Sequence, residues 1–123
     1  MTSKSVKDLV LLRFADLAQL SLQEAERYSF LCATAVNEYI ARLKTVPNEA
    51  QTEKLINLFA ASAYYRFCCL SAARQQYSQM SLSDVTIKNN ATHSCEAALN
   101  YKNMLFEDCA DIIQPSNSPL KTV

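Results

Sequence analysis

The chain has 123 residues, of which half are hydrophobic and a fifth are charged. Twelve basic and twelve acidic residues are interspersed, so the formal net charge is zero. This composition predicts one globular domain with one core and excludes a disordered chain. Without a basic excess, non-specific binding to nucleic acid or to a membrane surface is not favoured. The expected partners include no sequence-specific nucleic acid and no membrane.

The first residues do not have the pattern of a signal peptide. Two lysines precede a short apolar run, but Arg13 and Asp16 interrupt it and no small-residue cleavage site follows. No segment reaches the roughly 18 consecutive apolar residues that are needed to span a bilayer. We therefore expect a cytoplasmic protein.

The five cysteines are expected to be reduced thiols. Their odd number and their positions within helical patterns suit a cytosolic chain, and no Cys-x-x-Cys pair is present. Two of them are adjacent and point about 100° apart on a helix, so they cannot readily share one metal ion. The five are Cys32, Cys68, Cys69, Cys95 and Cys109, and we expect most of them to act as small buried hydrophobic residues.

The chain contains no glycine, which limits how its helices can end. Glycine is the residue that most readily takes the left-handed conformation found at tight turns and helix C-termini. We therefore expect helices that stop at proline, asparagine or serine, and we expect no sheet-rich fold.

Two amphipathic helices are predicted in the first third of the chain. Apolar residues at spacings of three and four predict helices over Ser5–Leu20 and Leu22–Lys44. Ser21 and Glu24 form a Ser-x-x-Glu capping box at the start of the second helix. A proline interrupts the chain after this helix, and Asn48 is placed to cap a third one.

The third helix, Glu49–Ser78, is the element around which we expect the rest of the chain to pack. At about 1.5 Å per residue it forms a rod on the order of 45 Å long. Between Leu55 and Leu70 apolar residues occupy more than one face, and alanines along the helix allow neighbours to approach closely. A helix of this kind lies in the middle of a bundle or is shared with a partner chain.

The segment after the third helix is predicted to be extended. Apolar and polar residues alternate from Met80 to Lys88 with a one-residue slip at Ser83-Asp84, and β-branched Val85 and Ile87 prefer an extended backbone. A lone strand has no sheet of its own, so it must form a small hairpin, lie on the helices or pair with another subunit.

A last helix is predicted over Thr92–Gln114, and residues 115–123 are predicted to form a flexible tail. The predicted fold class is therefore all-α. It is a four-helix bundle with a long central helix and one extended loop or small β-excursion before the last helix. Residues 1–114 are expected to form a single helical domain.

No pattern of residues indicates an enzyme, a metal site or a cofactor site. His93 and Cys95 could form a nucleophile pair, but residues two apart on a helix face different directions and no glycine turn provides an oxyanion hole. A phosphate-binding loop would also need glycine. Two groups of carboxylates lack the Glu-x-x-His spacing of di-iron bundles and are expected to be solvated: Glu24 with Glu26, and Glu107 with Asp108 and Asp111.

The order of segments in the second half of the chain carries a resemblance. Ala63-Tyr64-Tyr65-Arg66 and Ser71-Ala72-Ala73 lie in the central helix, and Ser81-Leu82-Ser83-Asp84-Val85-Thr86-Ile87 precedes the last one. This order resembles that of the small head–tail connector proteins, also called adaptor or head-completion proteins, of tailed phages and prophages. In that family an Ala-rich helix with Tyr-Arg leads into a segment similar to Ser-Phe-x-x-Gly-Asp-Val-x-Ile. Here Ser83 replaces the glycine and Leu82 most nearly replaces the phenylalanine, and the likeness extends from about Leu9 to Ile113.

The resemblance implies a helical bundle that assembles as a ring below the portal and joins the DNA-filled head to the tail. Its partners would be further copies of the chain and portal or tail proteins, in the host cytoplasm and in the virion. The alternative that we leave open is a small cytosolic helical adaptor or regulatory protein that binds a host protein. The expected assembly residues lie in the extended segment and the central helix: Leu82, Asp84, Val85, Ile87 and Lys88, with Tyr64 and Arg66.

Overall fold

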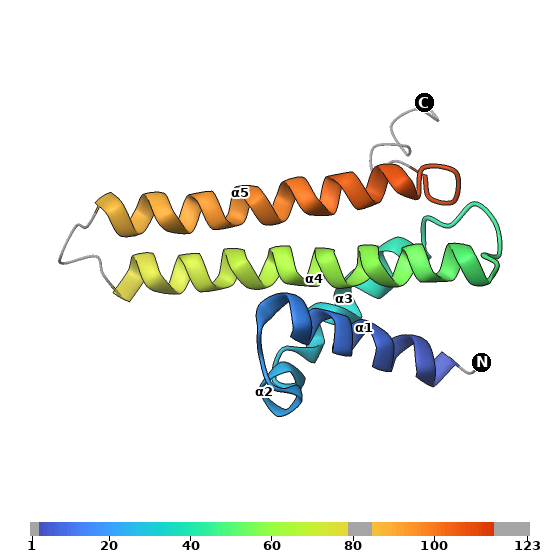
Figure 1. The fold of residues 1–123 in the computed structure, drawn as a ribbon, viewed down its shortest axis with the longest axis horizontal. Helices are drawn as coiled ribbons and strands as arrows, with labels where there is room; N and C mark the ends of the chain where they lie inside the picture. The colour runs from blue at the N-terminus through green and yellow to red at the C-terminus, as the bar shows by residue number, and fades with distance from the viewer. Residues whose placement is uncertain (1–2, 79–84, 115–123) are drawn as a thin grey trace.

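The part of the protein that the structure describes is built from five α-helices and contains no β-strand (Figure 1). The computed structural model describes residues 3–78 and 85–114, and the side chains of residues 6–74 and 95–114. The helices are α1 (Ser3–Ala18), α2 (Leu22–Glu26), α3 (Ser29–Ile40), α4 (Glu49–Ser78) and α5 (Val85–Asp108). The predicted all-α class is confirmed, whereas the predicted tail, residues 115–123, lies outside the described residues.

Helix α1 ends without the glycine that usually occupies this position. Gln19 takes the left-handed conformation, with φ of 57°, and the Leu20 amide donates to the Ala15 carbonyl at 2.9 Å. This is the hydrogen bond that closes a Schellman motif. The expectation that every helix would stop at proline, asparagine or serine is therefore wrong for α1. A left-handed residue with a Cβ costs on the order of 1 kcal/mol, which the protein accepts at Gln19.

The predicted helix Leu22–Lys44 is divided into α2 and α3. The capping box at its start is confirmed, because the Glu24 amide donates to Ser21 Oγ and the Ser21 amide donates to Glu24 Oε1, both at 3.1 Å. The division falls at Tyr28, which leaves helical angles and packs its ring edge-on against Phe67 of α4 at 5.0 Å. Contact with α4 therefore overrides the continuous helical pattern in the sequence.

Helix α4 begins and ends where the sequence predicts. Asn48 caps it through a reciprocal pair of hydrogen bonds, since the Gln51 amide donates to Asn48 Oδ1 at 2.8 Å and the Asn48 amide donates to Gln51 Oε1 at 3.0 Å. These bonds satisfy amides that would otherwise lack a partner in the first turn.

Helix α4 is the centre of the molecule (Figure 1). Helix α5 runs antiparallel along its length, while α1, α2 and α3 gather beside its N-terminal half. The buried residues form one cluster that α4 shares with α1, α2, α3 and residues 109–113, which follow α5. Its largest fully buried members are Phe14, Ile56, Leu58, Ile112, Ile113, Val10 and Cys109.

Helix α5 begins earlier than predicted, and the prediction of an extended chain from Val85 to Lys88 is wrong. Val85, Ile87 and Lys88 all lie in the first turns of α5. The preference of β-branched residues for strands is about 1 kcal/mol or less, so it does not prevent them from starting a long helix. The rest of the predicted extended segment, including Leu82 and Asp84, lies outside the described residues.

Helix α5 also ends earlier than predicted, at Asp108 rather than Gln114. Tight turns follow, and Leu43 and Ile113 form an isolated antiparallel bridge that is flanked by a 2.8 Å hydrogen bond from the Lys44 amide to the Ile112 carbonyl. Cys109, Ile112 and Ile113 are buried as the apolar pattern predicts, because the turns fold them back onto the core.

Candidate functional site

The exposure of α4 changes near its midpoint. Every residue from Leu55 to Ala63 except Asn57 is buried, whereas no residue from Tyr64 to Arg74 is buried. The apolar sequence continues across this boundary, so the second half carries apolar side chains that are only half-buried. We refer to residues 64–74 of α4 and residues 95–102 of α5 as the distal hairpin.

An aromatic cluster marks where the N-terminal helices stop covering α4. Phe14 of α1 packs edge-on against Phe67 at 5.7 Å, and Tyr28 packs edge-on against the same ring at 5.0 Å. Phe67 belongs to the shell of half-buried residues around the core. Leu70, about one turn further along, is half-buried but does not pack against that core. The distal hairpin therefore begins where α1 and the α2–α3 turn end.

Tyrosine and cysteine side chains are paired inside the distal hairpin at a spacing of four residues. The Tyr64 hydroxyl donates to Cys68, and this hydrogen bond is the main cause that raises the pKa of Tyr64. The Tyr65 hydroxyl likewise donates to Cys69, which raises the pKa of Tyr65. The thiol of Cys95 in α5 also donates to Cys69, so this sulfur contacts groups from both helices.

Cys95 does not have the properties of an activated nucleophile. Burial, and then the hydrogen bond to Cys69, raises the pKa of the Cys95 thiol to about 11. A reactive cysteine needs the opposite shift, toward a stable thiolate. The side chain of His93 lies outside the described residues, so the predicted pairing of His93 with Cys95 stays a hypothesis.

Alkylation of Cys95 by iodoacetamide is expected to accelerate about tenfold per pH unit from pH 7 to pH 10. Only the thiolate reacts, and its fraction rises tenfold per unit until the pH reaches the pKa, which is about 11 here and about 8.5 for a free cysteine. Quantifying the modified peptide by mass spectrometry measures the rate. In denaturant the rate should level off near pH 8.5, and the same plateau in the folded protein would contradict the raised pKa.

A polar cluster lies between α3, α4 and α5 at the edge of the distal hairpin. Arg66 pairs with Glu38 at 2.6 Å, and the guanidinium of Arg42 lies 3.8 Å from the same carboxylate. The buried Ser62 hydroxyl donates to the Tyr39 hydroxyl at 3.0 Å. These groups hold α3 against α4, although each exposed ion pair contributes about 1 kcal/mol or less.

The residues predicted to form an assembly interface are only partly brought together. Tyr64 is half-buried and packs against the core, while Arg66 is 42% exposed and is paired with Glu38 of its own chain. Both residues lie at the start of the distal hairpin, in its first turn on α4. Val85, Ile87 and Lys88 lie on α5, but their side chains are not among those described.

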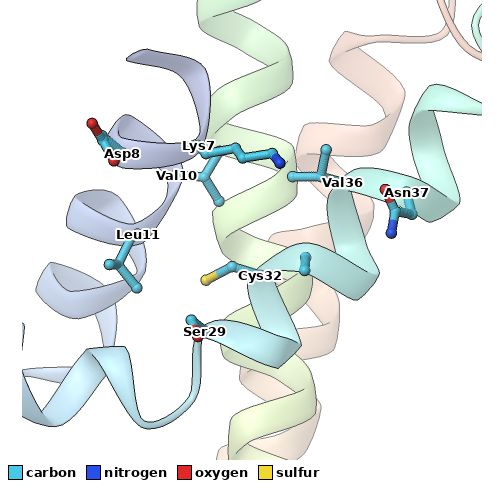
Figure 2. A pocket seen from close by; sticks show the side chains of 9 residues that line it. Lys7, Asp8, Val10, Leu11, Ser29, Cys32, Val36 and Asn37 are labelled. Carbon is cyan, nitrogen blue, oxygen red and sulfur yellow. The ribbon is translucent and has the colours of Figure 1, made fainter. Parts of the chain in front are cut away.

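A hollow lies between α1 and α3, away from the distal hairpin (Figure 2). Its volume is about 280 Å³, and Val10, Cys32 and Val36 supply apolar lining. Figure 2 shows the Lys7 side chain extending from α1 toward α3 across this space. Burial raises the pKa of Cys32 to about 11, so its thiol is neutral and acts here as an apolar side chain.

Residues 3–78 and 85–114 contain no group of three or more His, Cys, Asp or Glu side chains placed to hold a metal ion. No helix in this part of the chain has the length and hydropathy to cross a bilayer. No protein-family model matches the sequence, and no curated protein or solved structure matches it either.

Proposed function

We propose that the protein is a structural protein that associates through the distal hairpin, and that it serves as a head–tail connector of a tailed phage or prophage. In this role, copies of the chain form a ring that joins the portal to the tail. The observation that carries the proposal is the exposure boundary in α4, where burial stops at Ala63 while apolar residues continue to Leu70 and beyond. The assignment to the head–tail connectors rests on the resemblance in the order of the sequence segments.

The size of the distal hairpin suits one contact in a repeating assembly. Residues 64–74 of α4 extend about 16 Å, and two helices of about 10 Å diameter lie side by side. One face of this surface is therefore on the order of 300 Å², which is less than half of the roughly 800 Å² that each partner buries in a standard stable interface. In a closed ring every copy makes two contacts, so weak individual contacts suffice.

The proposed contact uses helix faces and not an extended segment. Because Val85 to Lys88 are helical, they offer no free strand edge to a neighbour. The side chains of Tyr64, Phe67 and Leu70 on α4 keep part of their area exposed, and of these three only Leu70 does not pack against the core. Covering apolar area is favourable by about 25 cal/mol per Å², so association gains from hiding them.

Leu70→Glu is expected to abolish self-association without unfolding the protein. Wild-type protein should form oligomers that increase with concentration from micromolar to millimolar, because each copy hides Leu70 against the next. A charge placed in that contact would have to be desolvated, and the free energy that this costs exceeds the free energy gained by burying the apolar surface. Sedimentation velocity measures the association, and circular dichroism reports whether the helices remain.

Leu12→Glu is the matched control for this experiment. Leu12 is a 48% exposed leucine on α1, outside the distal hairpin, and the same substitution there should leave association unchanged. Wild-type protein that stays monomeric over the whole range, or equal loss in both variants, would contradict association through the distal hairpin.

The connector class is tested separately from association. A connector gene is expected to lie beside genes for portal, capsid and tail proteins, and the purified chain is expected to bind a portal or tail ring. Binding lost in Leu70→Glu and kept in Leu12→Glu would support the proposed surface. A genome context without any virion genes would count against the connector and leave the self-association result unaffected.

The second candidate function is a small helical adaptor that binds a host protein. The hollow between α1 and α3 favours it, because apolar lining beside Lys7 and Asp8 could receive an apolar side chain from a partner. Here Leu11→Glu should remove host-protein binding and leave self-association intact. The reverse pattern, in which Leu70→Glu alone removes binding, would favour the first proposal.

A further inference from the structure

Cys69 of α4 and Cys95 of α5 lie within about one helical turn of the same level along the paired helices. The Lys102 ammonium lies 5.4 Å from the centre of the Tyr65 ring, which places these two residues near the same level. Since the helices are antiparallel, moving one turn forward from Tyr65 to Cys69 corresponds to moving about one turn back from Lys102, toward Ala98. Cys95 lies one further turn along α5, on the same face.

The packing at this level allows the two sulfur atoms to approach. Ala98 is only 3% exposed, and its small side chain lets α4 and α5 come close together. Cys69 is close enough to Cys95 to contribute, after burial, to the raised pKa of the Cys95 thiol, so the two thiols are neighbours across the helix pair. Both cysteines are half-buried, which leaves a path for a small reagent.

We propose that Cys69 and Cys95 form a redox modification site, in which a low-molecular-weight disulfide such as glutathione disulfide converts the two thiols into a cross-link between α4 and α5. One cysteine, as the thiolate, attacks glutathione disulfide, forming a mixed disulfide and releasing one glutathione thiolate. The second cysteine then attacks the protein sulfur of that mixed disulfide and releases the other glutathione. Two protein thiols are oxidised, one glutathione disulfide is reduced to two glutathione thiols, and the two protons pass to the glutathione sulfurs.

The other cysteines are poorly placed for this reaction. Cys68 is adjacent to Cys69 but points about 100° away around α4, and it accepts a hydrogen bond from Tyr64. Cys32 and Cys109 are buried in the core, with exposed fractions of 6% and 0%. The proposed site is therefore specific to one of the two adjacent cysteines, and it does not depend on the proposed function.

The test treats the full-length folded protein with glutathione disulfide at pH 8, blocks remaining thiols with N-ethylmaleimide and maps tryptic peptides by mass spectrometry. The expected product joins the peptide Phe67–Arg74 to the peptide Asn89–Lys102. Cys69→Ser should abolish this product, and Cys68→Ser, in the same peptide, should keep it. The cross-link should also raise the thermal unfolding midpoint by roughly 5 °C or more, because it restricts the unfolded chain.

Three outcomes would overturn the proposal. The cross-link could fail to form in the folded protein, it could form only after unfolding in urea, or it could survive in Cys69→Ser and vanish in Cys68→Ser. Circular dichroism of each reduced variant establishes that a lost cross-link reflects the missing sulfur and not a misfolded chain.

Discussion

Phe14→Ala is expected to lower the free energy of unfolding by about 3–5 kcal/mol. The Phe14 side chain is fully buried on α1 and packs edge-on against Phe67 at 5.7 Å. Truncation removes the transfer free energy of the ring, leaves a cavity and breaks the aromatic contact. Because small domains are stable by only about 5–15 kcal/mol, much of the stability would be lost. Urea unfolding followed by circular dichroism measures the difference.

Phe30→Ala is the matched control for this prediction. Phe30 is 55% exposed on α3, so the same chemical change there should lower the free energy of unfolding by about 1 kcal/mol or less. Equal losses at Phe14 and Phe30 would contradict the location of the core. A small loss at Phe14 would show that α1 does not depend on its contact with α4.

The features that sequence reasoning predicted correctly are those that local chemistry determines. The bounds of α4, the Asn48 cap and the Ser21–Glu24 capping box all depend on residues within one helical turn of each other. Hydrogen bonds between a polar side chain and a free backbone amide are short-range, so a sequence pattern is enough to find them. The same holds for the apolar pattern that places Ile112 in the core.

The features that sequence reasoning missed depend on contacts between distant residues. The helical pattern through Tyr28 is unbroken, and only the approach of Phe67 from α4 explains why the chain turns there. Val85 and Ile87 have a strand preference, but they lie at the start of α5, a helix of 24 residues that packs along α4. Propensities below about 1 kcal/mol per residue are weak enough for the context of the fold to override them.

The candidate site was predictable in part. The excess of apolar residues in the central helix predicts surface that its companions cannot hide, and this stays a prediction, because Tyr64, Phe67 and Leu70 are half-buried and not fully exposed. The approach of Cys69 to Cys95 was not predictable, because it requires the antiparallel register of α4 and α5. A spacing of one helical turn between Tyr65 and Cys69 was visible in the sequence, but nothing in it indicated which residue lies opposite.

Leu58→Ala and Leu70→Ala are expected to act on different properties of the same helix. Leu58 is fully buried, so its truncation should lower the free energy of unfolding by about 2–5 kcal/mol at any protein concentration. Leu70 is half-buried beyond the core, so its truncation should cost about 1 kcal/mol or less in dilute solution. Association stabilises only the folded state, so wild-type stability should rise with protein concentration, and this rise should disappear in Leu70→Ala.

Urea titrations at low and high micromolar protein separate these effects. A core defect shifts the unfolding curve at both protein concentrations, whereas an interface defect shifts only the curve at the high concentration. If Leu70→Ala destabilised the dilute protein as much as Leu58→Ala does, the second half of α4 would be part of the core of a single chain. The uncovered apolar surface would then no longer require a partner, and association through the distal hairpin would lose its physical basis.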